Sequence, residues 1–578
     1  MSKTNTKIYE TLRAAIGAAI QSAAAEGLLS SAEIPNFVLE EPADRSHGDI
    51  ATNAAMAGAR IFRMAPAKAA AIIVDKLNLS GTYIDRCEIA GPGFINFFLS
   101  QNYYAAVLNE IESDGDRYGE SDFGRGERVM VEFVSANPTG PMHLGNARGG
   151  ALGDCLAAVM SKAGYDVWRE FYVNDAGNQI EKFANSLEAR YLQIFDDSVE
   201  FPEDGYQGED ITERAREFAG IQGDKYLNAD SSERKAALVD YALPLNIERM
   251  KRDMAKYRIN FDRWFMESDL HNSGEVKAVI GLLTEKGMTY EKDGALWYRN
   301  KDVCTDILLA QGKTQDYIDR LELKDDVLIR QNGNPTYFAA DIAYHKNKFD
   351  RGFGKLINVW GADHHGHVMR LKGVMNAIGY DGDKLDILLM QLVRLMRDGQ
   401  PVKMSKQTGK AIQLADLLEE VPVDSARFIF NTREANTQMD FDLDLAVQQD
   451  SQNPVYYVQY AHARICSILR NIEAEGIFAR ACTDAELELL TAPEERELII
   501  LLSQFDSEII AAARDYDPTK VTKYVTNVAT GFHRFYNACR VKTDDEPLMQ
   551  ARLSLCRAVK TVIKNVLDMF NITCPEKM

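Results

Sequence analysis

The sequence predicts an α/β protein built on a doubly wound parallel sheet, with a small α+β domain before it and a helical bundle after it. A buried-strand pattern at 129–134, a helix rich in small residues and a second strand at 167–173 form the strand–helix–strand unit that builds parallel sheets. Beyond Asp450 the chain reads as helix after helix. Further strand patterns lie at 327–330, 356–360 and 387–396.

The N-terminal part predicts the small α+β domain. Apolar residues recur at helical spacing over 8–20, and helical periodicity returns over 51–77. A turn flanked by strand-like residues follows at 88–97, and a helix follows at 101–113. The Gly-rich stretch 114–127 reads as a linker, so we place the first domain, residues 1–113, before it.

The predicted sheet domain spans 126–450, and the predicted bundle spans 451–578. Within the sheet domain, about 178–324 is mostly amphipathic helix and polar loop and looks like a helical insertion. The pair at 398–399 (Asp-Gly) predicts a tight turn.

Bulk properties exclude several classes of protein. No apolar run approaches the roughly 20 residues that a membrane helix needs, and the N-terminus lacks a secretory pattern. The 8 cysteines form no C-x-x-C pair, which argues against a zinc ribbon or a disulfide framework and favours the cytoplasm. The net charge of −20 is unusual for a nucleic-acid binder, although a local basic groove can coexist with it.

Residues 143–146 (HLGN) carry the first candidate chemistry. They follow a predicted strand and open a helix, and helix N-termini attract phosphate. Gly145 allows close approach of a ligand to the backbone, and His143 and Asn146 can donate to phosphate oxygens. Taken alone, this short motif is compatible with chance.

Residues 403–410 (KMSKQTGK) form the second candidate motif. Lysines on a loop after a hairpin can clamp a polyphosphate and stabilise charge that develops on leaving pyrophosphate. A solvated basic loop is the alternative interpretation.

With both motifs in this order, the chain resembles the class I aminoacyl-tRNA synthetases, whose signatures are HIGH and KMSKS. The flanking sequence resembles the arginyl-tRNA synthetases from end to end. The segments that carry this resemblance are GPGF at 91–94, SANPTGP at 135–141, YVNDAGNQ at 172–179, WGADHHG at 360–366 and NPVYYVQYAH at 453–462.

The resemblance implies a Rossmann-like catalytic domain that ligates L-arginine to tRNA(Arg) with ATP and Mg²⁺, through an arginyl-adenylate whose formation needs bound tRNA. It implies catalytic roles for His143, Asn146, Lys403 and Lys406. It places Gly145, Gly361, Asp363, His364 and Met404 at ATP, together with His143, Asn146 and Lys406. It places Glu132, Asn137, Tyr337, Asp341 and His365 in the arginine pocket. Carboxylates suit a guanidinium, which is a planar cation with five donors.

The resemblance also implies that the bundle binds the anticodon and that the N-terminal domain reaches the tRNA elbow. Aromatic side chains can stack on unpaired bases, and arginines can meet phosphates, although packing between helices is an equally good interpretation of each tyrosine. The candidates are Tyr457, Tyr460, Arg464, Tyr536 and Met578, with Arg534 and Arg540 as further arginines. The family predicts a monomer.

Two features leave alternatives open. His364, His365 and His367 beside Asp363 could ligate zinc, but neighbouring residues rarely converge on one ion, and we expect no zinc there. Asn146 stands where the family signature has histidine, and Gln407 where it has serine. Asn146 leaves open the alternative that the chain binds tRNA without catalysis. The first motif alone would also fit another adenylyl-transferring enzyme.

Overall fold

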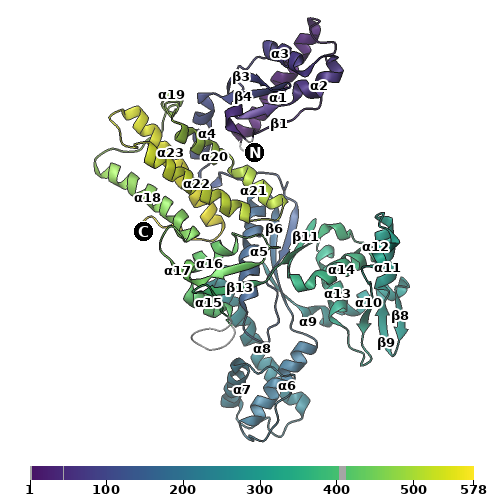
Figure 1. Cartoon of the computed structure of the whole chain (residues 1–578). Coiled ribbons are helices and arrows are strands. Elements are labelled where there is room, and N and C mark those ends of the chain that lie inside the picture. The colour runs from purple at the N-terminus through teal and green to yellow at the C-terminus, as the bar shows by residue number, and fades with distance from the viewer. Residues whose placement is uncertain (1–2, 43, 403–411) are drawn as a thin grey trace.

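The computed structural model describes residues 3–42, 44–402 and 412–578. A parallel sheet lies at the centre, with the N-terminal domain above it and the helical bundle beside it (Figure 1). The predicted fold class is therefore confirmed.

The central sheet has five parallel strands in the order β12-β11-β5-β6-β7. Its register pairs Arg128 with Asp166 between β5 and β6, and Lys355 with Val129 between β11 and β5. The strands are β5 (Arg128–Glu132), β6 (Asp166–Val173), β7 (Arg263–Met266), β11 (Lys355–Gly361) and β12 (Leu385–Met390).

Helices cover both faces of this sheet because its strands are apolar on both sides. Val129 and Val131 of β5 pack into the cluster that contains α5 (Leu144–Lys162), whereas Met130 packs into the cluster of α13 (Tyr337–Asp350). This alternation is the period of two expected of a strand.

The stretch 178–324, expected to be helical, also contains strands. β7 is the edge strand of the central sheet, and β8 and β9 form a separate antiparallel sheet with β10. The chain thus leaves the sheet twice, once before β7 and once after it. The elements are α6 (Asn178–Gln193), α7 (Glu209–Gln222), α8 (Ser231–Lys256), α9 (Glu267–Asn272), α10 (Glu275–Glu285), β8 (Thr289–Lys292), β9 (Ala295–Tyr298), α11 (Asn300–Ala310), α12 (Gln315–Asp319) and β10 (Asp326–Ile329).

The chain then returns through β11 and α14 (His365–Ala377) to a small sheet beside the main one. The expected strand at 387–396 is divided between β12 and β13 (Val393–Arg397), and 398–399 makes the predicted tight turn into β14 (Gln400–Val402). Asp398 and Gly399 both have positive φ, as this turn requires. The remaining elements are α15 (Leu414–Glu420), α16 (Val423–Phe430), β15 (Met439–Asp442) and α17 (Leu443–Val447).

The N-terminal domain packs helices against a four-stranded antiparallel sheet of order β1-β2-β4-β3. The periodicity predicted over 51–77 is divided into two helices, because Arg63 adopts a left-handed conformation and Pro66 starts the next helix. The elements are α1 (Lys3–Ala25), β1 (Leu39–Glu40), β2 (Ile50–Thr52), α2 (Ala54–Phe62), α3 (Pro66–Lys76), β3 (Ile84–Ala90), β4 (Phe94–Leu99) and α4 (Gln101–Asp114).

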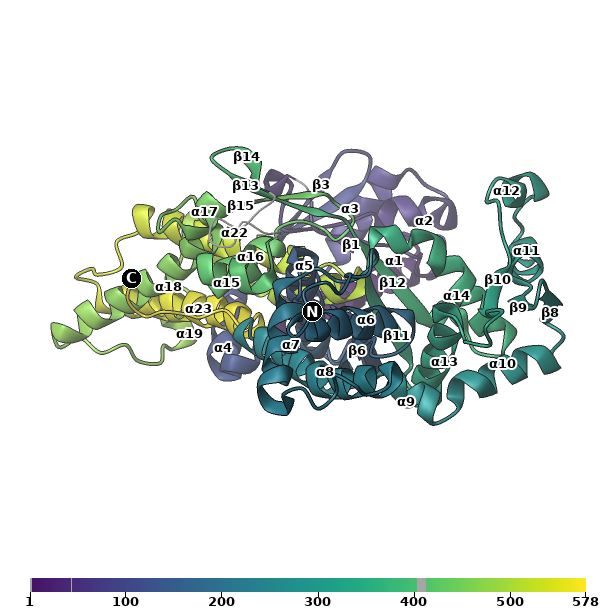
Figure 2. The same ribbon diagram turned by 90° about the horizontal axis from the view of Figure 1, so that it is seen from below.

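The C-terminal bundle packs against both other parts. Tyr118 of the predicted linker is buried against Phe505, so the linker packs against the bundle. The Tyr103 hydroxyl of α4 donates to Ser503 Oγ at 2.9 Å. Seen from below, α18 extends to one side and the β8–β10 lobe to the other (Figure 2). The helices are α18 (Pro454–Ala474), α19 (Asp484–Leu487), α20 (Pro493–Ser503), α21 (Phe505–Arg514), α22 (Thr519–Ala538) and α23 (Glu546–Met569).

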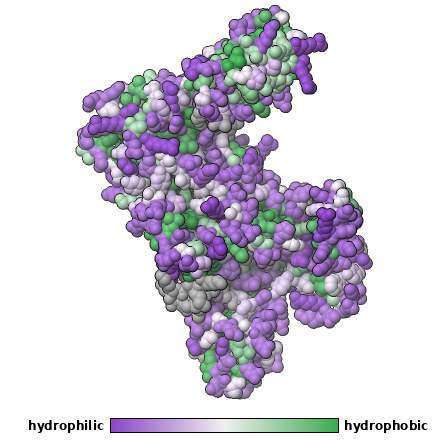
Figure 3. Space-filling view, in the orientation of Figure 1, coloured by the Kyte–Doolittle hydropathy of each residue, from purple (hydrophilic) through white to green (hydrophobic). Residues whose placement is uncertain are grey.

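The visible surface is mostly hydrophilic, with apolar side chains scattered over every lobe (Figure 3). The same view shows a hollow between the N-terminal domain and the β8–β10 lobe. Among the residues that the structure describes, no helix is long and apolar enough to cross a membrane.

Candidate active site

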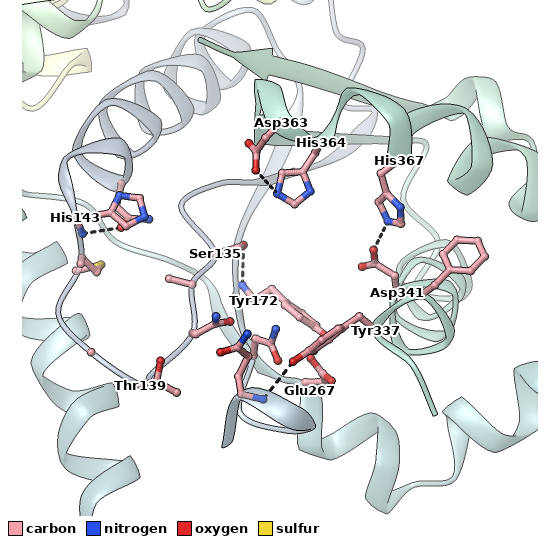
Figure 4. Close-up of a pocket in the computed structure, with 18 of the residues that line it drawn as sticks. Ser135, Thr139, His143, Tyr172, Glu267, Tyr337, Asp341, Asp363, His364 and His367 are labelled. Atoms are coloured by element: carbon pink, nitrogen blue, oxygen red, sulfur yellow. Dashed lines mark hydrogen bonds and ion pairs between the residues drawn. The ribbon is translucent and has the colours of Figure 1, made fainter. Parts of the chain in front are cut away.

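A cavity of about 930 Å³ opens at the carboxyl ends of the central strands (Figure 4). Its walls come from the segments that follow β5, β6, β7 and β11, and from the first turns of α13. Ligands of doubly wound sheets bind at this edge. The cavity brings together seven of the predicted site residues: Asn137, His143, Asn146, Tyr337, Asp341, Asp363 and His364.

His143 and Asn146 form a reciprocal cap at the start of α5. The Gly145 backbone N–H donates to Nδ1 of His143 at 3.1 Å, and the His143 backbone N–H donates to Oδ1 of Asn146 at 2.9 Å. Burial lowers the pKa of His143, which favours the neutral ring. Because Nδ1 accepts, the ring proton is on Nε2, and both Nε2 of His143 and Nδ2 of Asn146 remain as donors for a ligand.

Gly145, Gly361 and His365 are not among the residues that line the cavity. A Cβ on Gly145 would lie 3.0 Å from the His143 ring, and one on Gly361 would lie 2.4 Å from Oδ1 of Asp363. The space that each glycine leaves is therefore used by a neighbouring side chain. His365 is exposed, and His364 and His367 line the cavity instead.

One end of the cavity is acidic. Asp341 and Tyr337 lie one turn apart on α13, as the sequence predicts, and Glu267 enters from the start of α9. Burial alone would raise the pKa of Asp341, but its hydrogen bond with His367 and the nearby Lys348 ammonium lower it on balance. Asp341 is therefore a charged carboxylate, suited to a cationic substrate.

Glu267 is the second carboxyl group at this end. It is 3% exposed and accepts a hydrogen bond from the Tyr172 hydroxyl at 2.9 Å. Burial, with added repulsion from Asp341 and Asp175, raises the pKa of Glu267 to about 7. Its charge therefore changes near neutral pH and would be favoured by an arriving cation.

Glu132, a predicted arginine ligand, lies behind the cavity wall rather than on it. Its carboxylate accepts from Ser135 Oγ at 2.8 Å and pairs with Lys348, which is fully buried. Lys348 also donates to Asn358 Oδ1 at 2.9 Å. In the structure this carboxylate thus holds the loop after β5, where Val134 and Ser135 both have positive φ.

Several cavity residues escape prediction from the sequence. Glu267 follows β7, a short strand hidden inside the stretch taken as an insertion, and a strand signal there would have pointed to it. Tyr172 lies in a segment that carries the family resemblance, yet nothing in its local pattern marks a site. Arg370 lines the cavity from α14, and no local pattern points to it; the sequence points to His367 beside it only through the zinc alternative.

The predicted phosphate clamp, Lys403, Met404 and Lys406, lies outside the described residues. The segment after it meets the first signature directly: Gln413 forms a β-bridge with His143, and the Leu414 N–H donates to the Met142 carbonyl at 2.9 Å.

The histidines of the zinc alternative have different partners. Within 3–42, 44–402 and 412–578, no three histidine, cysteine or acidic side chains gather as metal ligands would. His364 is 3.6 Å from Asp363 and packs on Trp360, whereas His367 pairs with Asp341.

The predicted tRNA-binding aromatics gather between α18 and α22. The rings of Tyr457 and Tyr460 pack on His533, and the Arg464 guanidinium lies 4.4 Å from the centre of the Tyr536 ring. Tyr460 is 40% exposed. Met578 is the last residue of a C-terminal tail that contacts α18: His462, which lies between Tyr460 and Arg464 in the sequence, contacts the Pro575 carbonyl at 2.9 Å.

Comparisons with known proteins cover the whole chain. Residues 10–99 match the family "Arginyl tRNA synthetase N terminal domain", residues 108–467 match "tRNA synthetases class I (R), catalytic domain", and residues 458–578 match "DALR anticodon binding domain".

Similar full-length proteins carry the name arginine–tRNA ligase. The chain is 52% identical to that of Ruminiclostridium cellulolyticum, over 100% of both chains. It is 54% identical to that of Caldanaerobacter subterraneus subsp. tengcongensis, over 99% of both. The solved structure of Thermus thermophilus arginyl-tRNA synthetase has the same fold, with a TM-score of 0.69, 23% identity and coverage of 98% of this chain and 100% of that one.

Proposed function

The chain belongs to the arginyl-tRNA synthetases, the ATP-using ligases of arginine and tRNA, and we propose that it works through an arginyl-adenylate whose formation requires bound tRNA. The observation that supports the adenylate intermediate is one cavity with two chemically different ends. The capped start of α5 offers donors at one end, and Asp341 and Glu267 offer carboxylates at the other.

The acidic end suits the arginine side chain. Asp341 would pair with the guanidinium. As arginine enters, Glu267 would lose its proton and make a second contact with the guanidinium. The Tyr337 hydroxyl, which accepts from the Gln179 N–H at 3.2 Å, would close this end of the pocket. Asn137 on the loop after β5 would hold the α-amino group.

The other end suits ATP. The arginine carboxylate attacks the α-phosphorus and pyrophosphate leaves. The 2′-hydroxyl of the terminal adenosine of tRNA then attacks the carbonyl carbon of the arginyl-adenylate, AMP leaves, and the hydroxyl proton is released. We assign Nε2 of His143 and Nδ2 of Asn146 to the phosphates, with Lys403 and Lys406 stabilising the charge that develops on pyrophosphate. Asp363 and His364 would face the nucleotide. Mg²⁺ would enter and leave with the phosphates, as part of the substrate.

Little covalent chemistry falls to the protein in this scheme. Catalysis would come from holding carboxylate and α-phosphorus in line and from fixed donors around the phosphates. The Gln413–His143 bridge supports this, because it joins the segment after the lysine loop to the phosphate end of the cavity.

The bundle would bind the anticodon and the N-terminal domain the tRNA elbow. The cluster of Tyr457, Tyr460, Arg464 and Tyr536 supports the first assignment, since aromatic rings and an arginine are presented together between α18 and α22. We expect a monomer that works in the cytoplasm, where its substrates are and where its free cysteines stay reduced.

Transfer of labelled arginine to total tRNA tests the ligase, and ATP–pyrophosphate exchange with and without tRNA tests the order of events. We expect charging with arginine alone and exchange only when tRNA is present. Exchange without tRNA would overturn the tRNA requirement. Binding of tRNA with no charging by any amino acid would instead support the non-catalytic alternative.

A further inference from the structure

Asp341 is held by a chain of side chains that runs back from the cavity. Oδ2 of Asp341 pairs with Nε2 of His367, and Nδ1 of His367 accepts from Nε of Arg370 at 2.5 Å. Nη1 of Arg370 donates to Oδ1 of Asp326 at 2.6 Å. Asp326 lies on β10, Asp341 on α13, and His367 and Arg370 on α14.

This chain fixes the protonation of His367. Arginine is always protonated, so Nε of Arg370 can only donate, and Nδ1 of His367 must accept. Nε2 then carries the ring proton and donates to Oδ2 of Asp341. His367 is therefore a neutral donor with a single tautomer.

We propose that His367 is a positioning residue for arginine recognition: it locks the Asp341 carboxylate in one orientation, and Arg370 holds His367 in the tautomer that can do so. The inference rests on the proposed role of Asp341 as guanidinium ligand. With Oδ2 engaged by a neutral donor, Asp341 keeps its full negative charge and presents Oδ1 to the substrate.

The surroundings of His367 support a fixed orientation. Its side chain is 10% exposed, and its ring packs edge-on against Phe338 and tilted against Trp360. The charged groups that face it are Asp341 and Arg370. Asp326 neutralises Arg370, which lines the cavity, so that Arg370 does not repel the cation that the pocket would bind.

The arrangement also suits discrimination between cations. A carboxylate oxygen held in one direction favours a planar guanidinium, whose N–H donors point in fixed directions, over a lysine ammonium, which behaves as a point charge. His367 would therefore contribute to selection of arginine as well as to its affinity.

Steady-state aminoacylation by four full-length variants tests the proposal. His367→Ala removes the donor, whereas His367→Gln restores an amide donor close to the Nε2 position. Asp341→Asn tests the carboxylate itself, and Lys372→Ala on the same helix serves as control. We expect His367→Ala to raise the KM for arginine roughly ten-fold, with kcat and the KM for ATP within about two-fold. His367→Gln should recover most of this loss, Asp341→Asn should exceed it, and Lys372→Ala should match the wild type.

The outcomes separate the inference from the proposed function. An unchanged KM for arginine in His367→Ala, while Asp341→Asn shows a large rise, overturns the positioning role alone. So does a His367→Gln variant as defective as His367→Ala when thermal unfolding shows both folded. An unchanged KM in Asp341→Asn overturns the assignment of Asp341, and the inference fails with it.

Discussion

The side-chain oxygen of Asn146 accepts a hydrogen bond from the backbone N–H of His143, 2.9 Å away, across the first turn of α5. The residue that departs from the family signature thus also caps the helix that carries that signature. Its amide has two roles that can be separated: Oδ1 satisfies the helix terminus, and Nδ2 is available to a phosphate.

Asn146→Asp and Asn146→Ala separate these roles. Asp keeps the capping oxygen but replaces the donor with a negative charge, so we expect a melting temperature close to wild type and a kcat/KM for ATP lowered roughly a hundred-fold. Ala removes both, and should also lower the free energy of unfolding by about 1 kcal/mol. Wild-type kcat/KM in Asn146→Asp would show that Nδ2 does not serve ATP.

Glu267 makes arginine binding depend on pH. Its pKa of about 7 in the arginine-free protein means that it is protonated below neutrality and must lose a proton when a guanidinium binds. The KM for arginine should therefore fall as pH rises to about 7 and level off above it, with a slope of at most about ten-fold per pH unit. In Glu267→Gln this dependence should disappear while the KM stays high. An unchanged pH profile in that variant would remove Glu267 from the pocket.

The same shift predicts a change in stability of the free protein. A carboxyl group whose folded pKa lies above its ordinary value of 4.5 stabilises the fold fully below pH 4.5, and this contribution is lost progressively as pH rises to about 7. Over that window the free energy of unfolding of Glu267→Gln should therefore rise relative to that of the wild type, by at most roughly 3 kcal/mol at pH 8. Denaturant unfolding at pH 5 and pH 8 measures it, and an equal difference at both values would contradict the shift.

The sequence predicts the frame of this molecule better than its pocket. The buried-strand pattern at 129–134 and the small-residue helix after it suffice for the sheet and α5, and signature residues His143 and Asn146 do reach the cavity. Glu132 is a residue whose surroundings the local sequence pattern does not predict. Local sequence cannot reveal that a buried lysine two hundred residues away neutralises this carboxylate, because the contact exists only once α13 packs on the sheet.

The buried Glu132–Lys348 pair can be tested by a double-mutant cycle. Lys348→Met leaves a buried carboxylate without its cationic partner and should lower the free energy of unfolding by about 3–5 kcal/mol. Glu132→Gln should also destabilise, and the double variant should recover much of the loss. Urea unfolding of the wild type, the two single variants and the double variant gives the coupling free energy between Glu132 and Lys348. If Glu132 also contacts arginine, the KM for arginine will stay raised in the double variant; a wild-type KM there would limit Glu132 to a structural role.

Tyr460 offers the sharpest test of the bundle as a tRNA-binding surface. Its ring lies 6.1 Å from that of His533 at an interplanar angle of 29°, and its 40% exposure leaves a face that a base can reach. Tyr457, by contrast, is tied to Thr530 Oγ1 at 3.2 Å.

Tyr460→Ala should raise the KM for tRNA roughly ten-fold, because stacking on a base contributes about 1–3 kcal/mol. The KM for arginine and the melting temperature should hardly change, since the ring supports little of the core. Tyr460→Phe should behave as wild type, because stacking needs the ring and not the hydroxyl. Phe478→Ala is the matched control: Phe478 is 65% exposed in the same part of the chain but lies outside the aromatic cluster. Equal effects of Tyr460→Ala and Phe478→Ala on the KM for tRNA would mean that the cluster between α18 and α22 is packing alone.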